Sequence, residues 1–302
     1  MSLVSVVIPT LNRPKLVVRA LASVFAQTYP EIEVIVIVDG PDHETIAALR
    51  QIGDPRLQVI VNPRSLTAAG ARNVGIDRAK GDWIAFLDDD DEWLPTKLAR
   101  QMEVAADHGL AVISCLSRVV TPRDSFIRPK IIYDNAIPID DYLFDRRWPF
   151  GPLSFVQTSS YLLPRAVFEK IRFRTDNPHD DWDLLLRLSK QLEVQVVTVP
   201  EVLAILYVED GRPSLSKSGS WLASLLWIDS MRPMLTRRAY SGFCLSVVGP
   251  RAAKEREYRA IPLLLHRAFK YGSPRLWRVA TFMGLWLVPH ELFRRIRGVI
   301  SP

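Results

Sequence analysis

Short apolar runs alternate with amphipathic stretches over most of the chain. Runs typical of buried strands lie at residues 2–9, 32–38, 57–61, 83–87 and 110–115. Between these runs, apolar residues recur at helical spacing, which predicts helices near residues 17–25, 45–51, 68–79 and 97–108. Strands and helices that alternate in this way predict an α/β fold with a mostly parallel sheet flanked by helices.

The pattern is less regular after the fifth run. Four prolines interrupt residues 117–150, so we expect a surface segment of short irregular pieces there. Further strands are expected at residues 155–163, 194–199 and 202–208, and further helices at 164–171 and after the acidic residues 180–183. From Ser220 the pattern changes to helices rich in Trp, Leu and Arg.

Polar side chains follow three of the predicted strands. Thr10 and Asn12 follow the first strand, Asp39 and Asp42 the second, and Asp88–Asp91 the fourth. Ligands of parallel sheets bind outside the carboxyl ends of the strands. These residues are therefore expected to meet at one rim of the sheet.

The four consecutive aspartates at Asp88–Asp91 need a reason to be gathered. Two unit charges about 4 Å apart repel by about 1 kcal/mol in water and by more where solvent is excluded. A solvated turn whose last Asp caps the next helix explains one or two of them. A divalent cation that holds a phosphorylated ligand explains more, because Mg²⁺ and Mn²⁺ prefer carboxylate oxygens. We favour the metal site.

A second acidic group, Asp180, Asp181 and Asp183, opens an amphipathic helix. The helix dipole favours negative charge at this end, so capping is an alternative for Asp180 or Asp181. Capping does not explain all three carboxylates.

Composition and charge add a second region to this picture. The chain has 302 residues, 48% of them hydrophobic, and a net charge of +6. From Arg237 onward, thirteen Lys and Arg residues stand against three Glu. A basic tail that carries aromatic residues predicts an anionic membrane surface as a partner, and nucleic acid is not expected because no nucleic-acid-binding motif accompanies the charge. The alternative is that these helices pack on the first domain.

The predicted organisation is an α/β domain over residues 1–216 and a basic helical extension over 217–302. The first domain divides into a nucleotide half, about 1–116, and an acceptor half, about 117–216. The start of the chain has no signal-peptide pattern, and no apolar run reaches the roughly 20 residues of a membrane span. We expect a cytoplasmic protein that binds peripherally to the inner face of the plasma membrane. Two buried free thiols are expected at Cys115 and Cys244.

Five stretches of the chain resemble the sequence blocks of family 2 glycosyltransferases. In the order and spacing of that family they are Val4–Arg13, Val38–Asp42, Ala71–Gly75, Leu87–Asp91 and Asp180–Leu184. The resemblance spans roughly residues 3–216. It implies a GT-A fold, a nucleotide-diphosphate sugar donor such as a UDP- or dTDP-sugar, a divalent cation and inversion at the anomeric carbon.

The resemblance also assigns roles to single residues. It implies nucleoside contacts for Pro9, Thr10, Asn12, Asp39 and Asp42, of which Asp39 accepts from the uracil ring. It places Arg72 near the diphosphate and Asp88 near the ribose, and Asp89 between the two motif aspartates is expected to bind the nucleotide as well. It implies that Asp90 and Asp88 bind the metal and that Asp181, or its neighbour Asp180, is the general base. The family often has a metal-binding His after the last strand, whereas Glu209–Arg212 contain none.

The function expected is transfer of a sugar to a hydroxyl of a glycan or a lipid-linked acceptor, in cell-envelope polysaccharide synthesis. A sugar nucleotidyltransferase is the alternative enzyme. It would carry a Gly-rich basic loop after the first strand, and residues 10–14 contain no Gly. A non-catalytic nucleotide-sugar-binding protein is the remaining alternative.

Overall fold

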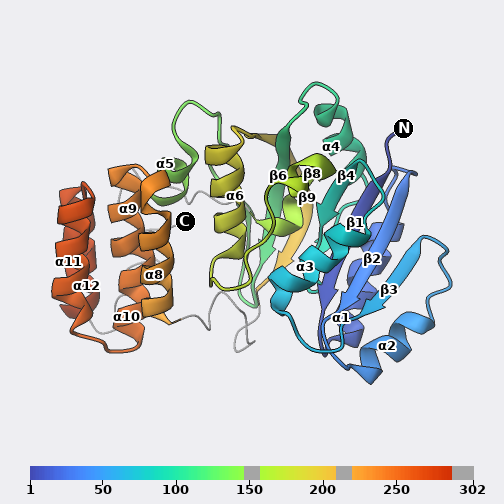
Figure 1. Ribbon diagram of the computed structural model, residues 1–302, viewed down its shortest axis with the longest axis horizontal. Coiled ribbons are helices and arrows are strands. Elements are labelled where there is room, and N and C mark those ends of the chain that lie inside the picture. The colour runs from blue at the N-terminus through green and yellow to red at the C-terminus, as the bar shows by residue number, and fades with distance from the viewer. Residues whose placement is uncertain (146–156, 209–219, 288–302) are drawn as a thin grey trace. The chain divides into compact units, whose positions relative to one another are not determined.

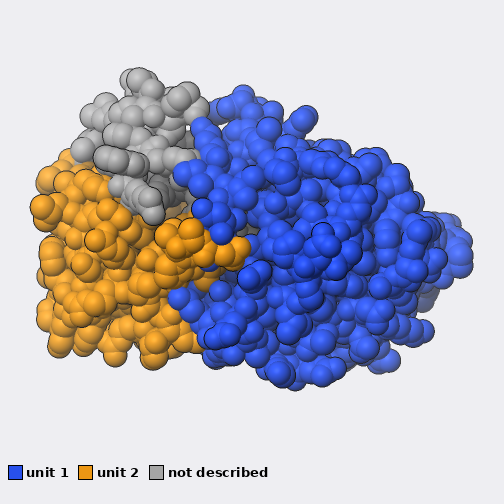
Figure 2. All heavy atoms as spheres, turned by 90° about the horizontal axis from the view of Figure 1, so that it is seen from above, with its two compact units in different colours: residues 1–134, 155–176, 180–212 blue, residues 135–154, 177–179, 213–302 orange. Residues whose placement is uncertain are grey.

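The computed structural model describes residues 1–145, 157–208 and 220–287. The chain forms two compact units, which Figure 2 colours separately. Unit 1 contains described residues 1–134, 157–176 and 180–208, and unit 2 contains 135–145, 177–179 and 220–287. The segment 135–145, predicted to lie in the first domain, is thus part of the helical unit.

Unit 1 is an α/β unit (Figure 1). Its strands are β1 Val4–Thr10, β2 Ile32–Val38, β3 Leu57–Val61, β4 Trp83–Phe86, β5 Glu92–Trp93, β6 Ala111–Val120, β7 Ser125–Arg128, β8 Leu162–Pro164 and β9 Gln195–Tyr207. Its helices are α1 Pro14–Phe25, α2 His43–Arg50, α3 Thr67–Arg78, α4 Lys97–Ala105 and α6 Asp180–Gln191, with 3₁₀ turns η1 Thr158–Ser160 and η2 Arg165–Glu169.

The strands form one sheet in the order β3-β2-β1-β4-β8-β6-β9-β5, with β7 paired to β6. The first four are parallel, and β6 and β9 are parallel to each other. Strand β8 lies between these groups and is antiparallel to both of its neighbours. The predicted α/β fold with a mostly parallel sheet is confirmed.

Helices cover both faces of the sheet around β1. Val4, Val6 and Ile8 belong to one apolar core together with residues of α1, α2 and α4. The next residue in the alternation, Val7, points to the other face, where it lies against Gly75 of α3. All seven residues of β1 are buried, as expected for a central strand that is covered on both faces.

Some elements differ from the prediction. Strand β6 runs on to Val120 and pairs with β7, where an irregular segment was expected. The two strands expected at 194–199 and 202–208 are one long strand, β9, whose pairing with β6 shifts register near Cys115 and Leu116. The strand expected at 155–163 begins outside the described residues, and its described part contains η1 before β8.

Unit 2 is helical over its described residues. Its elements are α5 Ile139–Phe144, α8 Trp221–Met231, η3 Arg232–Met234, α9 Arg237–Phe243, the π-helical turn η4 Cys244–Val248, α10 Gly249–Lys254, α11 Ala260–Tyr271 and α12 Leu276–Leu287. Arg278 is 1% exposed, and its side chain donates to the carbonyls of Phe144 and Gly242, so it ties α12 to α5 and α9. His179 is buried against the rings of Trp227 and Phe243.

Both cysteines are buried free thiols, as predicted. Across the helices of the described residues, we find no segment with the length and apolar character that a membrane crossing requires.

The close approach of α3 to β1 gives a stability prediction. A Cβ built on Gly75 would lie 2.3 Å from Cγ1 of Val7, a stiff side chain in a buried strand. We expect Gly75→Ala to lower the free energy of unfolding by about 1–3 kcal/mol through overpacking, despite the better helix propensity of Ala. Thermal denaturation measures this. The control Gly109→Ala, whose Cβ would meet nothing within 4 Å, should not destabilise the protein. Equal melting temperatures for wild type and Gly75→Ala would contradict the packing argument.

Candidate active site

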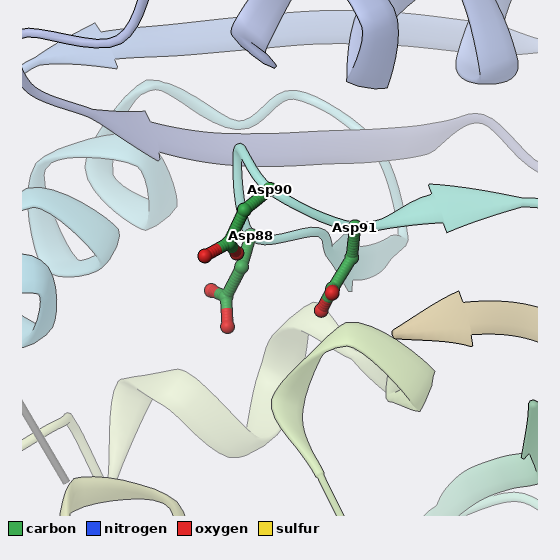
Figure 3. A group of neighbouring side chains, drawn as sticks. All are labelled: Asp88, Asp90 and Asp91. Atoms are coloured by element: carbon green, nitrogen blue, oxygen red, sulfur yellow. The ribbon is translucent and has the colours of Figure 1, made fainter. Parts of the chain in front are cut away.

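The loop that leaves β4 carries a group of carboxylates. Asp88, Asp90 and Asp91 each offer one oxygen, and these atoms lie within 4.8 Å of one another. In Figure 3 the three side chains lie on the same side of this loop. Three close carboxylate oxygens are a suitable donor set for Mg²⁺ or Mn²⁺. The residues present therefore fit a divalent cation, and Asp88 and Asp90 are the ligands predicted from the sequence.

Asp89 points elsewhere and is held by residues at the end of β1. It accepts from Thr10 Oγ1 at 2.8 Å and from the Arg13 guanidinium at 2.8 Å. Burial raises the pKa of Asp89, and the positive charge of Arg13 opposes that shift. Arg13 also lies 3.4 Å from Asp90, so one guanidinium compensates two members of the aspartate run.

Asp91 was not singled out as a site residue from the sequence. Its side chain is 3% exposed and accepts from Ser159 Oγ at 2.7 Å and from the Tyr207 amide at 3.2 Å. Burial, and next the charges of Asp88 and Asp90, raise the pKa of this carboxyl well above its usual value. The sequence signal for Asp91 was its place as the last member of the run of four aspartates.

Arg72 joins the aspartate loop to the second acidic group. Its guanidinium contacts Asp88 at 2.6 Å and Asp180 at 2.7 Å, and it lies 3.9 Å from Asp181. The residue is 4% exposed. Burial opposes its charge, but the three carboxylates more than compensate and raise the pKa of Arg72.

Asp180 and Asp181 occupy the first turn of α6, as the sequence predicted. Their environments differ. Asp180 is paired with Arg72, whereas Asp181 accepts from Thr158 Oγ1. Burial, and next the charge of Asp180, raise the pKa of Asp181 to about 7.

The residues predicted to touch the nucleoside lie at the ends of β1 and β2. Pro9 and Thr10 are the last residues of β1, and Asn12 adopts a left-handed backbone with φ of 55°. The Asn12 amide donates to Asp42 at 2.6 Å, while Asp42 also caps α2 through the Thr45 amide. Burial acts against the charge of Asp42, but these hydrogen bonds lower its pKa.

Asp39 is engaged by the protein itself. It accepts from Asn62 Nδ2, Ser65 Oγ and the Leu66 amide, and it is 4% exposed. These bonds tie the end of β2 to the loop after β3. Contact of Asp39 with a uracil ring stays a prediction.

A family assignment follows from comparison with known proteins. The family model described as "Glycosyl transferase family 2" matches residues 5–172, which is more than half of the chain. This chain belongs to glycosyl transferase family 2. The protein is therefore a glycosyltransferase, and the nucleotidyltransferase alternative is wrong. The matched region contains the blocks Val38–Asp42, Ala71–Gly75 and Leu87–Asp91 and all of the first block except Val4.

Curated relatives have related names. The amylovoran biosynthesis glycosyltransferase AmsB of Erwinia amylovora is 31% identical over 245 residues, which is 78% of this chain and 79% of that protein. The UDP-Glc:alpha-D-GlcNAc-diphosphoundecaprenol beta-1,3-glucosyltransferase WfaP of Escherichia coli is 39% identical over 102 residues. That alignment covers 34% of this chain and 41% of WfaP.

Solved structures share the fold. The structure of S. aureus TarS 1-349 in complex with UDP-GlcNAc has a TM-score of 0.63 and 17% identity, over 97% of this chain and 92% of TarS. The mannosyltransferase PcManGT from Pyrobaculum calidifontis, in complex with GDP-Man and Mn²⁺, has a TM-score of 0.59 and 18% identity, over 99% and 85% of the two chains. These likenesses establish that this family 2 glycosyltransferase has a GT-A fold.

The aspartate loop gives a binding prediction. We expect Asp90→Ala to abolish the Mn²⁺ dependence of UDP binding, because it removes one of three clustered carboxylates. Calorimetry of UDP binding with and without Mn²⁺ measures this. Asp107→Ala, an exposed aspartate after α4, is the matched control and should bind as wild type does. Unchanged Mn²⁺ dependence in Asp90→Ala would refute the ligand assignment.

Proposed function

We propose that this glycosyltransferase moves a sugar from a UDP- or dTDP-sugar to a hydroxyl of a glycan or lipid-linked acceptor, with inversion and with a divalent cation. The observation that carries the proposal is the position of Arg72. One buried guanidinium contacts Asp88 of the aspartate loop and Asp180 of α6. A group that assists the leaving diphosphate and a group that activates the acceptor hydroxyl thereby come within reach of one donor sugar.

Asp181 is the better candidate for the general base. Asp180 is directly paired with Arg72, whose Nη1 lies 2.7 Å from Oδ2 of Asp180, so this carboxylate is already engaged by the guanidinium. Asp181 is 3.9 Å from the same guanidinium, and its pKa of about 7 lies near the value at which a base works best at neutral pH. We assign Asp181 to accept the proton of the acceptor hydroxyl and Asp180 to hold Arg72.

The leaving-group side uses the aspartate loop. Asp88 and Asp90 would hold the cation, with Asp91 beside them. When bound there, a divalent cation neutralises the charge that develops on the departing diphosphate. Arg13 and Arg72 add two fixed positive charges at the same loop. The chain's own part is to hold these groups in place before the reaction begins.

The names of similar proteins support the donor and acceptor classes. WfaP is named for a UDP-glucose donor and a diphosphoundecaprenol-linked acceptor, and a fold neighbour was solved with UDP-GlcNAc. AmsB, which aligns with 78% of this chain, is named for synthesis of a polysaccharide. By analogy with these proteins, we infer that this chain uses a uridine-diphosphate sugar as its donor. Its acceptor would be a sugar that is linked to a lipid diphosphate.

The base assignment predicts both a rate loss and a pH dependence. Asp181→Asn should keep UDP affinity and lower the transfer rate at least ~10²-fold, the scale expected for loss of a general base. In wild type, kcat should rise as pH increases through about 7, because only the ionised carboxylate accepts a proton. Steady-state kinetics from pH 5.5 to 8.5 measure both effects. If Asp180→Asn is inactive and Asp181→Asn is active, the two roles are reversed.

We also propose that unit 2 binds an anionic membrane surface. Basic residues surround the Tyr271 ring in this unit. Arg232 Cζ lies 4.2 Å and Lys270 Nζ 5.2 Å from the centre of that ring. Arg237 donates to the Gly272 carbonyl at 2.9 Å, and Arg238 follows it. Together with the half-exposed Phe269, these residues are called the Tyr271 patch: Arg232, Arg237, Arg238, Phe269, Lys270 and Tyr271.

Charge supports a membrane as the partner of this patch. Within the described part of the chain, no carboxylate lies within 4.0 Å of the basic groups of Arg232, Arg237, Arg238 or Lys270. Basic residues near a membrane contribute about 1 kcal/mol each on anionic lipid, and an exposed aromatic side chain adds apolar contact. A lipid-linked acceptor would give the enzyme a reason to bind there. The alternative for Lys270 and Arg237 is stabilisation of the α11 C-terminus.

Vesicle binding tests this patch. Full-length protein should co-sediment with anionic vesicles at low salt and remain in the supernatant with neutral vesicles. The variant Arg237→Glu, Arg238→Glu, Lys270→Glu should lose at least ~100-fold in binding, at about 1 kcal/mol per basic residue. The matched control reverses three other exposed charges, Lys254, Arg256 and Arg259, and should bind as wild type does. Wild-type protein that stays in solution with anionic vesicles would refute the membrane proposal.

A further inference from the structure

Three consecutive hydroxyl residues form the 3₁₀ turn η1, Thr158–Ser160, and all three are buried. The turn lies between the two acidic groups of the active site, although its sequence is about seventy residues away from the aspartate loop and about twenty from α6. Each of its hydroxyl groups makes a different contact.

Thr158 holds the base. Its Oγ1 donates to Oδ1 of Asp181, and the Thr158 residue is fully buried. Arg72 Nη1 is 3.9 Å from this carboxylate and is directly paired with Asp180 instead. The Thr158 hydroxyl thus contributes to fixing the orientation of the Asp181 carboxylate.

Ser159 holds the aspartate loop at two points. Its Oγ donates to Oδ2 of Asp91 at 2.7 Å and accepts from the Asp88 amide at 3.1 Å. The Ser159 hydroxyl therefore holds both the backbone of Asp88 and the side chain of Asp91. Gln157, directly before the turn, lies 3.4 Å from the same Asp91 oxygen.

The turn itself is fixed to the core of unit 1. Trp93 Nε1 donates to the Ser159 carbonyl and Gln101 Nε2 donates to the Ser160 carbonyl, both at 2.8 Å. The Ser160 hydroxyl meets that of Ser114 on β6 at 3.1 Å. Buried hydrogen bonds of this kind keep a short segment from moving relative to the sheet.

We propose that η1 sets the position of the base relative to the leaving-group side, with Thr158 and Ser159 as its two positioning residues. In an inverting transfer the hydroxyl attacks from the face opposite to the leaving group, so the base and the diphosphate site must be held a fixed distance apart. Adjacent residues on one anchored turn accomplish this, because neither acidic group can shift without breaking a bond to η1. This inference rests on the proposed function.

Paired variants separate the two roles. Thr158→Val keeps the side-chain shape and removes the hydroxyl, and Thr158→Ser retains the hydroxyl. Ser159→Ala removes the contact with the aspartate loop. Ser117→Ala is the matched control, because the Ser117 hydroxyl is buried on β6 and has no hydrogen-bond partner among the residues that the structure describes. The measurements are kcat for transfer, KM for the donor, Kd for UDP with and without Mn²⁺ by calorimetry, and melting temperature.

Thr158→Val should lower kcat about 10- to 100-fold, the scale of one hydrogen bond to a charged group, and leave the Kd for UDP with Mn²⁺ unchanged. Thr158→Ser should restore kcat. Ser159→Ala should weaken UDP binding about tenfold when Mn²⁺ is present and leave binding without Mn²⁺ unchanged. Ser117→Ala should match wild type in all measurements.

The inference is overturned if Thr158→Val keeps the wild-type kcat, if Thr158→Ser fails to restore it, or if Ser159→Ala binds UDP with Mn²⁺ as tightly as wild type. A fall in UDP affinity for Thr158→Val as large as its fall in kcat would also overturn it, because the turn would then act on general stability. Failure of the proposed function looks different: wild type would transfer no sugar from UDP- or dTDP-sugars with any acceptor offered.

Discussion

The active site depends on the compensation of carboxylate charge by one buried guanidinium. Asp88, Asp180 and Asp181 come from segments more than ninety residues apart in the sequence, and their mutual repulsion opposes bringing them together. Arg72 contacts the first two at 2.6 and 2.7 Å. Helix α3 can present Arg72 there because Gly75, one turn later, lets the helix lie against Val7 of β1. Because Gly75 has no side chain, α3 can pack closely on β1, and this packing positions the positive charge of Arg72 in the site.

The remaining carboxylates are accommodated in two other ways. The negative charge of Asp89 is compensated by the Arg13 guanidinium. The Asp91 carboxyl has a raised pKa and accepts hydrogen bonds from the Ser159 hydroxyl and the Tyr207 amide. A buried carboxyl with a raised pKa is less charged at neutral pH and costs less to enclose. It is also ready to become charged when a cation arrives, because a nearby positive charge favours the ionised form. The loop can therefore be acidic in composition without carrying four full charges in the free protein.

The sequence predicted those features whose signal is local. Strands such as Ile32–Val38 were visible as apolar runs, and the Asp-terminated strand and the acidic start of α6 marked two groups of site residues. The contacts of η1 could not be predicted in this way, because Thr158 and Ser159 are ordinary hydroxyl residues until the fold brings them to Asp181 and Asp91. The same holds for the bonds that occupy Asp39, since its partners at residues 62–66 follow the next strand. The extension of β6 was missed because prolines nearby suggested irregular structure, whereas pairing with β7 and β9 stabilises the strand.

The net positive charge of the C-terminal region is partly neutralised by ion pairs within unit 2. The basic residues there do not all face a partner: Arg275 and Arg278 pair with Asp145, and Arg267 pairs with Asp229. Buried or half-buried pairs of this kind fix one helix against another and contribute little field outside the protein. Among the described residues, the basic side chains of the Tyr271 patch form no ion pair with a carboxylate and remain available to an anionic surface. A count of Lys and Arg therefore overstates the attraction to a membrane, and it is the position of the uncompensated residues that determines which face of unit 2 would make contact.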